Sequence, residues 1–262
     1  MKDILSEIVA NKRFEIDVQK MNFNEELLKD HVDPTLPCHS LRAALSCSKS
    51  GIISEFKRRS PSKGWIHQDA DPIDIVPAYA EAGASALSIL TDEKFFGGQL
   101  KDIKSVRREV NIPILRKDFI IDSYQLYQAK QIGADAVLLI ASILSVDEYH
   151  KLLEKAHELN MEVLLEIHSE KELEYISPEV DVIGINNRNL GSFVTDVENS
   201  FRLAELLPKD AVLVSESGIS DIETIRRLRK KGFRGFLIGE TFMRNDDPAK
   251  KLKEFIQEIE QQ

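Results

Sequence analysis

The sequence predicts an eightfold β/α barrel with an N-terminal helical extension, and three observations lead to this fold class. About eight short apolar runs recur along the chain at spacings of roughly 20–35 residues. Each run is nearly continuous in apolar residues, which is typical of parallel strands covered on both faces. Amphipathic helical segments separate the runs, and a length of 262 residues suits one barrel of this kind.

The main alternative is an open doubly wound sheet. That fold usually carries a glycine-rich turn directly after its first strand. Here the first apolar run continues into the sequence Lys-Arg-Arg-Ser-Pro at 57–61. The missing turn favours the barrel.

The first 50 residues form the extension that precedes the first strand. Residues 1–20 are expected to be a helix, because Ile4 and Ile8 mark an apolar face with charges between them. A polar stretch follows, and D-P-T-L-P at 33–37 interrupts the chain. Residues 40–45 then predict a second short helix.

The barrel strands and helices are expected to alternate over the rest of the chain. The strands are predicted at 52–56, 86–90, 112–116, 136–140, 163–166, 182–185, 212–215 and 235–238. Helices are predicted at 72–83, 123–133 and 145–159 among others. Several end at a glycine, the residue favoured just past a helix end. No linker divides the chain, so residues 1–262 are interpreted as one domain, with 1–50 as its helical extension.

Composition excludes several classes of protein. The formal net charge of −9 argues against nucleic acid as the partner. No apolar run is long enough to span a membrane, and the charged N-terminus lacks a signal-peptide core. The two cysteines and six histidines show no metal-ligand spacing, so no metal or cofactor is expected. We therefore expect a cytoplasmic monomer that binds a small anionic molecule.

The most informative residues stand where the predicted strands end. Charged and polar side chains at these ends are not needed for packing, and burying them unpaired is costly. Glu55 and Lys57 share one face of the first strand, whereas Phe56 points to the opposite face and should pack against the outer helices. In a barrel, polar residues at the carboxyl ends of strands indicate an active site. The candidates for catalysis are Glu55, Lys57, Lys117, Glu166, Asn186 and Glu216.

Two loops are suited to bind a phosphate. The sequences S-E-S-G-I-S at 215–220 and I-G-E-T-F-M at 238–243 follow the seventh and eighth strands. Loops at these positions commonly bind phosphate in this fold, and small residues let backbone N–H groups approach an anion. Ser60 would add a hydroxyl from the opposite rim. Phe96 and Phe119 are candidates for the walls around an aromatic ring.

Seven ordered motifs resemble those of indole-3-glycerol phosphate synthase, a family of tryptophan biosynthesis. The similarity covers the chain from about residue 50 to its end, and the helical extension also fits the family. The motifs are S-E-F-K-R-R-S-P-S-K-G, F-F-G-G, L-R-K-D-F-I-I-D, V-L-L-E-I-H, I-G-I-N-N-R-N-L, S-E-S-G-I and L-I-G-E-T-F-M.

The resemblance implies a carboxy-lyase that needs no cofactor. The implied substrate is 1-(2-carboxyphenylamino)-1-deoxyribulose 5-phosphate, an anthranilate-ribulose phosphate. Its ring closes with loss of carbon dioxide and water to give indole-3-glycerol phosphate. By resemblance Lys117 is the general acid and Glu166 the base of the dehydration, a task that Glu55 would share. Lys57 would position the substrate carboxylate and is a second candidate for the dehydration acid.

The remaining assignments also come from the resemblance. Asn186 and Arg188 match positions that hold the substrate, and Glu216 and Ser217 match a polar pair on the seventh strand. The phosphate rim is matched by Ser60, Gly218, Gly239 and Glu240, and the apolar pocket by Pro61, Phe96, Phe119 and Leu138. The acidic side chain of Glu240 is expected to point away from the phosphate, with its N–H facing the anion.

Two other readings of the barrel stay open at this point. In one, Lys117 or Lys57 is the nucleophile of a Schiff-base aldolase that acts on a sugar phosphate. In the other, the barrel binds phosphate without catalysis.

Overall fold

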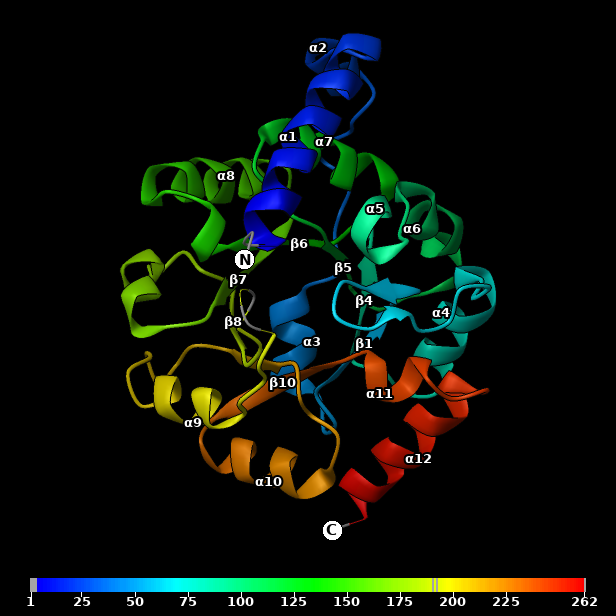
Figure 1. Ribbon diagram of the computed structural model, residues 1–262, viewed down its shortest axis with the longest axis vertical. Helices are drawn as coiled ribbons and strands as arrows, with labels where there is room; N and C mark the ends of the chain where they lie inside the picture. The colour runs from blue at the N-terminus through cyan, green and yellow to red at the C-terminus, as the bar shows by residue number, and fades with distance from the viewer. Residues whose placement is uncertain (1–3, 190, 192, 262) are drawn as a thin grey trace.

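Eight parallel strands close into a barrel in the computed structural model, which describes residues 4–189, 191 and 193–261 (Figure 1). Each strand pairs with the next along the chain, and the last pairs with the first. The strands are β1 (Ile52–Phe56), β4 (Ala86–Leu90), β5 (Ile114–Lys117), β6 (Ala136–Ile140), β7 (Glu162–Ile167), β8 (Val182–Asn186), β9 (Leu213–Glu216) and β10 (Phe233–Ile238). The barrel prediction is confirmed, and the doubly wound alternative is wrong.

The largest differences from the predicted strands lie at two strand starts. Strand β5 begins at Ile114 rather than at residue 112, because Pro113 has no N–H to donate to a ladder. Strand β10 begins at Phe233, two residues before the predicted start. Its pairing with β9 shifts register between Phe233 and Gly235. Because of this irregularity, the first residues of the strand do not continue the apolar run from which the strand was predicted.

Side chains alternate between two apolar layers. Those that point inward fill the barrel, for example Ile53, Leu115 and Leu164. Those that point outward, including Phe56, pack with the surrounding helices. The expected opposition of Phe56 to its neighbours Glu55 and Lys57 is therefore correct.

Helices surround the barrel on the outside (Figure 1). The main ones are α4 (Pro72–Glu81), α6 (Leu100–Val106), α7 (Ser123–Ile132), α8 (Val146–Glu158), α9 (Glu198–Ala204), α10 (Ile222–Lys230) and α12 (Pro248–Glu260). Shorter helical turns are α5 (Glu93–Phe96), α11 (Glu240–Met243), η1 (Arg107–Glu109), η2 (Ala141–Ile143) and η3 (Glu170–Tyr175). A small antiparallel pair, β2 (Arg59–Ser60) with β3 (Gly64–Trp65), follows β1 and was not predicted.

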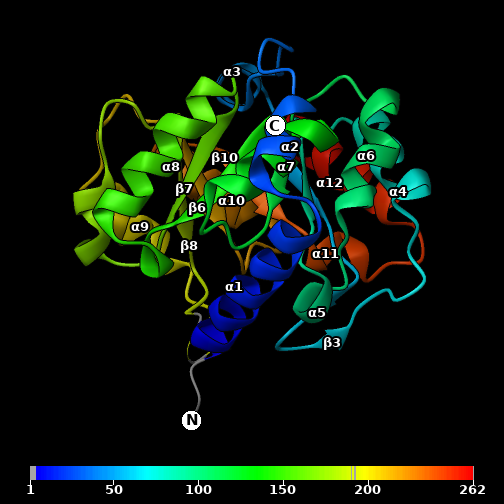
Figure 2. The same cartoon turned by 90° about the horizontal axis from the view of Figure 1, so that it is seen from above.

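The N-terminal extension reaches both ends of the barrel. Helix α1 (Ile4–Asn22) starts at the mouth, and residues 1–3 of the predicted helix lie outside the described residues. Helix α3 (Leu41–Cys47) lies at the opposite end (Figure 2), where Leu41 and Leu45 are fully buried in the interior core. Between them, α2 (Glu25–Asp30) packs on α7.

Helix α2 occupies the segment that we expected to be a polar stretch. Its Asn24 side chain accepts the N–H of Leu27 and so caps the first turn. Only Leu28 of its six residues is buried, which is too little apolar periodicity to signal a helix. Within the described residues, no helix is both long and apolar enough to cross a membrane.

Candidate active site

A cavity of about 640 Å³ opens at the carboxyl ends of the strands. All of the residues predicted for the site line it, with the exception of Ser60. Ser60 is buried in β2, and its hydroxyl has no hydrogen-bond partner in the described part of the chain. The barrel therefore gathers these residues from strands that are far apart in sequence, while their individual roles stay predictions.

Lys117 lies at the centre of the charged part of the cavity. Its Nζ is 3.0 Å from Oε2 of Glu166 and is also hydrogen-bonded to Oε2 of Glu216. We call these three residues the Lys117 cluster. They come from β5, β7 and β9, which alternate around the barrel and point their last inward side chains toward one another. Burial by itself would lower the pKa of Lys117, but the two carboxylates outweigh it and raise the pKa, so the amine is an ammonium.

His168 supports Glu166 from the other side. Nε2 of His168 lies 3.3 Å from Oε1 of Glu166, and Nδ1 lies 3.8 Å from the carboxylate of Glu172. Burial would lower the pKa of His168, but these carboxylates raise it to about 10. For Glu166, burial would raise the pKa, but Lys117 and His168 hold it well below its usual range. His168 was not predicted to act here, although its spacing of two residues from Glu166 places both on the same face.

Glu216 differs from Glu166 although both contact the same ammonium. Burial raises the pKa of Glu216 to about 7, against the attraction of Lys117 and with the repulsion of Glu166. Its Oε1 is buried and has no hydrogen-bond partner among the described residues. One carboxylate of the Lys117 cluster is thus firmly ionised, and the other titrates near neutrality.

Lys57 and Glu55 form a second ion pair in the cavity. Nζ of Lys57 is 2.5 Å from Oε1 of Glu55. Close packing of the carboxylates explains two glycines, Gly184 in β8 and Gly239 directly after β10. A Cβ at Gly239 would collide with Glu55, and a Cβ at Gly184 would collide with Glu216. Gly239 therefore has a packing function in addition to its predicted place on the phosphate rim.

An apolar slot lies beside the charges. The ring centroids of Phe96 and Phe119 are 5.9 Å apart, with 38° between the ring planes. Leu138 and Pro61 also line the cavity, and Ile8 of α1 extends the apolar wall. The slot is suited to receive a flat aromatic ring.

The turn after β9 has an unusual backbone. Ser217 and Gly218 have φ values of +67° and +76°, and a left-handed serine is strained unless its surroundings hold it. Asn187, to which the sequence assigned no role, donates a 3.0 Å hydrogen bond to the carbonyl of Ser217. Its amide oxygen accepts the Ser200 hydroxyl at 2.7 Å. Asn187 therefore supports this turn from a buried position.

Arginines stand close to the same rim. Oε2 of Glu240 lies 3.9 Å from Nη2 of Arg188, and Oε1 pairs with Arg244. Glu240 lines the cavity, and its carboxylate lies beside the two guanidinium groups, while the expectation that it points away from a bound phosphate stays a prediction. Other lining residues that the sequence did not single out are Ser62, Lys63, Thr195, Ser220, Thr241 and Arg244. Lys63 and Ser62 belong to the motif at 54–64, and this motif could have identified them as residues of the site.

Similarity to known proteins decides the family. A family model described as indole-3-glycerol phosphate synthase matches residues 5–255. The chain belongs to the indole-3-glycerol phosphate synthase family. A protein of that name from Bacteroides thetaiotaomicron is 65% identical over 260 residues, covering 99% of this chain and 100% of that protein. Another from Polaromonas naphthalenivorans is 41% identical and covers 98% of this chain and 100% of that protein.

The resemblance inferred from the strand-end motifs is therefore confirmed. As a member of the indole-3-glycerol phosphate synthase family, the chain is an enzyme, a carboxy-lyase of tryptophan biosynthesis. Among the described residues, no group of three or more His, Cys, Asp or Glu is arranged to hold a metal ion.

Solved structures agree on the fold. The α subunit of tryptophan synthase from Legionella pneumophila superposes with a TM-score of 0.60 at 12% identity, covering 84% of this chain and 97% of that one. The corresponding subunit from Pyrococcus furiosus gives a TM-score of 0.59 at 15% identity, with 80% and 97% covered. At these identities the likeness concerns the barrel alone.

Proposed function

We propose that the chain closes the indole ring of 1-(2-carboxyphenylamino)-1-deoxyribulose 5-phosphate, with Lys117 as the general acid. As the aromatic ring carbon attacks the ribulose carbonyl, its oxygen becomes an alkoxide and needs a proton. An alkoxide is more basic than an amine, so it takes this proton even from a lysine whose pKa is raised. The observation that supports this best is the Lys117 ammonium, held between two buried carboxylates in the cavity that also contains the aromatic slot.

Glu166 is the base that we assign to the dehydration. In the resting site the ammonium of Lys117 keeps the carboxylate of Glu166 ionised but weakly basic. Once Lys117 has given up its proton, only His168 still lowers the pKa of Glu166, so Glu166 becomes a stronger base for the following step. Glu216, with a pKa of about 7, is suited to return a proton to Lys117 near neutral pH. Glu55 is the alternative base, because it lines the same cavity.

The other cavity residues bind and orient the substrate. Lys57 attracts the anthranilate carboxylate, and Asn186 and Arg188 hold the linking atoms. The slot formed by Pro61, Phe96, Phe119 and Leu138 takes the aromatic ring, and the backbone at Ser217, Gly218, Gly239 and Glu240 takes the phosphate, with Ser60 nearby. Folding a flexible substrate into its reactive pose can contribute on the order of 7–11 kcal/mol.

Formation of indole-3-glycerol phosphate from purified protein tests the proposal directly. Fluorescence should report turnover of about 1 s⁻¹ or faster without added metal or cofactor. Replacing Glu166 with Gln should slow the dehydration, so that an intermediate accumulates. A wild-type rate and product profile in Glu166→Gln would move the base assignment to Glu55.

The aldolase reading predicts a different observation. A Schiff base between a sugar phosphate and Lys117 or Lys57 would be trapped by borohydride as a covalent adduct. We expect no adduct by mass spectrometry after borohydride treatment in the presence of substrate.

We also propose that the enzyme acts as a monomer in the cytoplasm. The charged residues that we assign to the reaction all come from one chain, and they line one cavity. Light scattering of the purified protein would test this, with a mass close to 29.7 kDa expected.

A further inference from the structure

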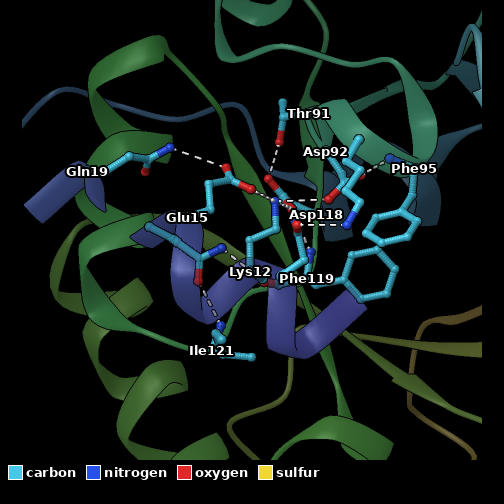
Figure 3. Close-up of polar contacts among 12 residues, drawn as sticks. Lys12, Glu15, Gln19, Thr91, Asp92, Phe95, Asp118, Phe119 and Ile121 are labelled. Carbon is cyan, nitrogen blue, oxygen red and sulfur yellow. Dashed lines mark hydrogen bonds and ion pairs between the residues drawn. The ribbon is translucent and has the colours of Figure 1, made fainter. Parts of the chain in front are cut away.

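A second buried lysine lies outside the residues assigned to the reaction. Lys12 belongs to α1, and only 1% of its surface is exposed. Its Nζ lies 3.0 Å from Oδ1 of Asp118, 3.1 Å from Oδ2 of Asp92 and 3.0 Å from Oε2 of Glu15 (Figure 3). The ammonium thus joins the N-terminal helix to the segments that follow β4 and β5.

Each of the two aspartates also fixes the backbone of the segment in which it lies. Oδ1 of Asp92 accepts the N–H of Phe95 at 2.8 Å and caps α5. Oδ1 of Asp118 accepts the N–H of Phe119, also at 2.8 Å. Asp118 is further held by the hydroxyl of Thr91 at 2.6 Å.

The backbone segments that Asp92 and Asp118 hold carry the two aromatic residues of the slot. Helix α5 carries Phe96, the next residue after Phe95, and the segment after β5 carries Phe119. The two rings contact each other at a tilt of 38°, with their centroids 5.9 Å apart. The ammonium of Lys12 therefore bridges the two carboxylates whose segments form the two walls of the slot.

The charges of this group balance. We call Lys12, Asp92, Arg116 and Asp118 the Lys12 cluster, in which the guanidinium of Arg116 lies 2.9 Å from Asp118. All four side chains are at most 3% exposed, and their two positive charges match two negative ones, whereas Glu15, the third carboxylate near Lys12, is 36% exposed. An apolar side chain would dock a helix as well or better, because buried ion pairs are costly to desolvate. Packing alone does not explain a charge at this place.

We propose that Lys12 is a positioning residue that shapes the aromatic slot by fixing the positions of Phe96 and Phe119 relative to each other. The inference rests on the proposed function in one respect, namely that the slot takes the aromatic ring of the substrate. Lys12 touches no substrate atom in this role. It acts through Asp92 and Asp118 on the two segments.

The test compares Lys12→Met with Lys20→Met. Lys20 lies on the same helix and also reaches across to the barrel, where its Nζ is 2.7 Å from Asp122, but it is about one-third exposed and does not line the cavity. Binding of anthranilate, followed by its own fluorescence, probes the slot, and inorganic phosphate probes the opposite rim. Lys12→Met should weaken anthranilate binding by about tenfold and leave phosphate binding within about twofold of wild type, while Lys20→Met should change neither.

A variant that is partly unfolded would bind both ligands more weakly, so a second variant separates stability from positioning. Lys12→Met combined with Asp92→Asn removes the surplus negative charge, and the Asn oxygen still caps α5. This double variant should recover thermal stability relative to Lys12→Met but keep the weak anthranilate binding. Equal loss of both ligands in the double variant, or wild-type anthranilate binding in either variant, would overturn the inference.

The outcome for the wild-type enzyme distinguishes the two proposals. If the wild type neither turns over substrate nor binds anthranilate, the proposed use of the slot is wrong, and the role of Lys12 fails with it. If the wild type does both and Lys12→Met binds anthranilate like Lys20→Met, only the role of Lys12 is wrong.

Discussion

Two lysines in this molecule occupy nearly the same arrangement and differ in what surrounds them. Lys117 and Lys12 are each held by a pair of buried carboxylates, Glu166 with Glu216 and Asp118 with Asp92. The side chain of Lys117 is 12% exposed and borders the cavity, whereas that of Lys12 is 1% exposed beneath α1.

The ionisation of the carboxyl groups in the two clusters differs as well. Arg116 brings the Lys12 cluster to neutrality, and the pKa of Asp118 is held well below its usual range against the effect of burial by Lys12 and Arg116. In the Lys117 cluster Glu166 also has the His168 imidazolium, but Glu216 has only the shared ammonium of Lys117, and burial and the repulsion of Glu166 raise the pKa of Glu216 to about 7. A buried cluster whose carboxylate stays ionised, as Asp118 does, fixes structure, whereas a cluster beside a cavity with a carboxyl group that titrates near neutrality, as Glu216 does, keeps a proton that can move. Four predictions test this comparison, from the largest expected effect to the smallest.

Lys117→Met should lower kcat by about 10²- to 10⁴-fold, the usual range for a positioned acid. The variant should lose little thermal stability, because Glu216 can become protonated once the ammonium is gone and the cavity admits water. Steady-state kinetics and thermal unfolding of the same preparation measure both quantities. A kcat near that of the wild type would remove Lys117 from the mechanism.

Lys12→Met should lose much stability and little activity, the reverse of Lys117→Met. It leaves a buried carboxylate without a counter-charge, and breaking such a pair typically lowers the free energy of unfolding by about 3–5 kcal/mol. The fall in kcat should be much smaller than in Lys117→Met. Denaturant unfolding of both variants would contradict the comparison if Lys117→Met proved the less stable of the two.

Asn187→Ala should affect the phosphate rim and spare the slot. Without the amide, the strained turn at Ser217 loses the hydrogen bond to its carbonyl, so binding of inorganic phosphate should weaken by about tenfold. Anthranilate binding should stay the same, which is the opposite of the result expected for Lys12→Met. Ser200→Ala removes only the hydroxyl that donates to Asn187 and should give a smaller change in the same direction.

The smallest expected effect is a dependence of the protein's stability on pH that is caused by His168. The pKa of this imidazole is about 10 in the folded protein and about 6.5 in an unfolded chain, so between these values the folded state holds a proton that the unfolded state lacks. Its contribution to stability is fully present below about pH 6.5 and is lost as pH rises through about 10.

His168→Asn should therefore be less stable than the wild type at about pH 6, and the gap should narrow at about pH 10. Thermal melts of both proteins across this range measure the difference directly. A gap that does not depend on pH would show that the imidazole is neutral in the folded protein.

The sequence by itself determined the barrel and most of the site. Apolar runs of the right length and spacing indicated eight parallel strands, since a strand covered on both faces must be apolar throughout. The same runs ended in Lys117, Glu166 and Glu216, and strand ends in this fold meet at one mouth. Periodicity and topology together therefore placed charges that are 99 residues apart within hydrogen-bonding distance.

Only the tertiary structure decided which charged and polar groups Lys12 and Asn187 contact. Lys12 follows the helical period of an ordinary surface helix, and only the docking of α1 against the ends of β4 and β5 buries its ammonium between Asp92 and Asp118. Asn187 stands between two predicted site residues, yet its function depends on Ser200 of α9 and on the backbone after β9. The local sequence pattern predicts on which face of its helix or strand a side chain lies. Which charge or hydroxyl it meets there depends on the packing of segments distant in sequence, because such contacts form only when the whole chain folds.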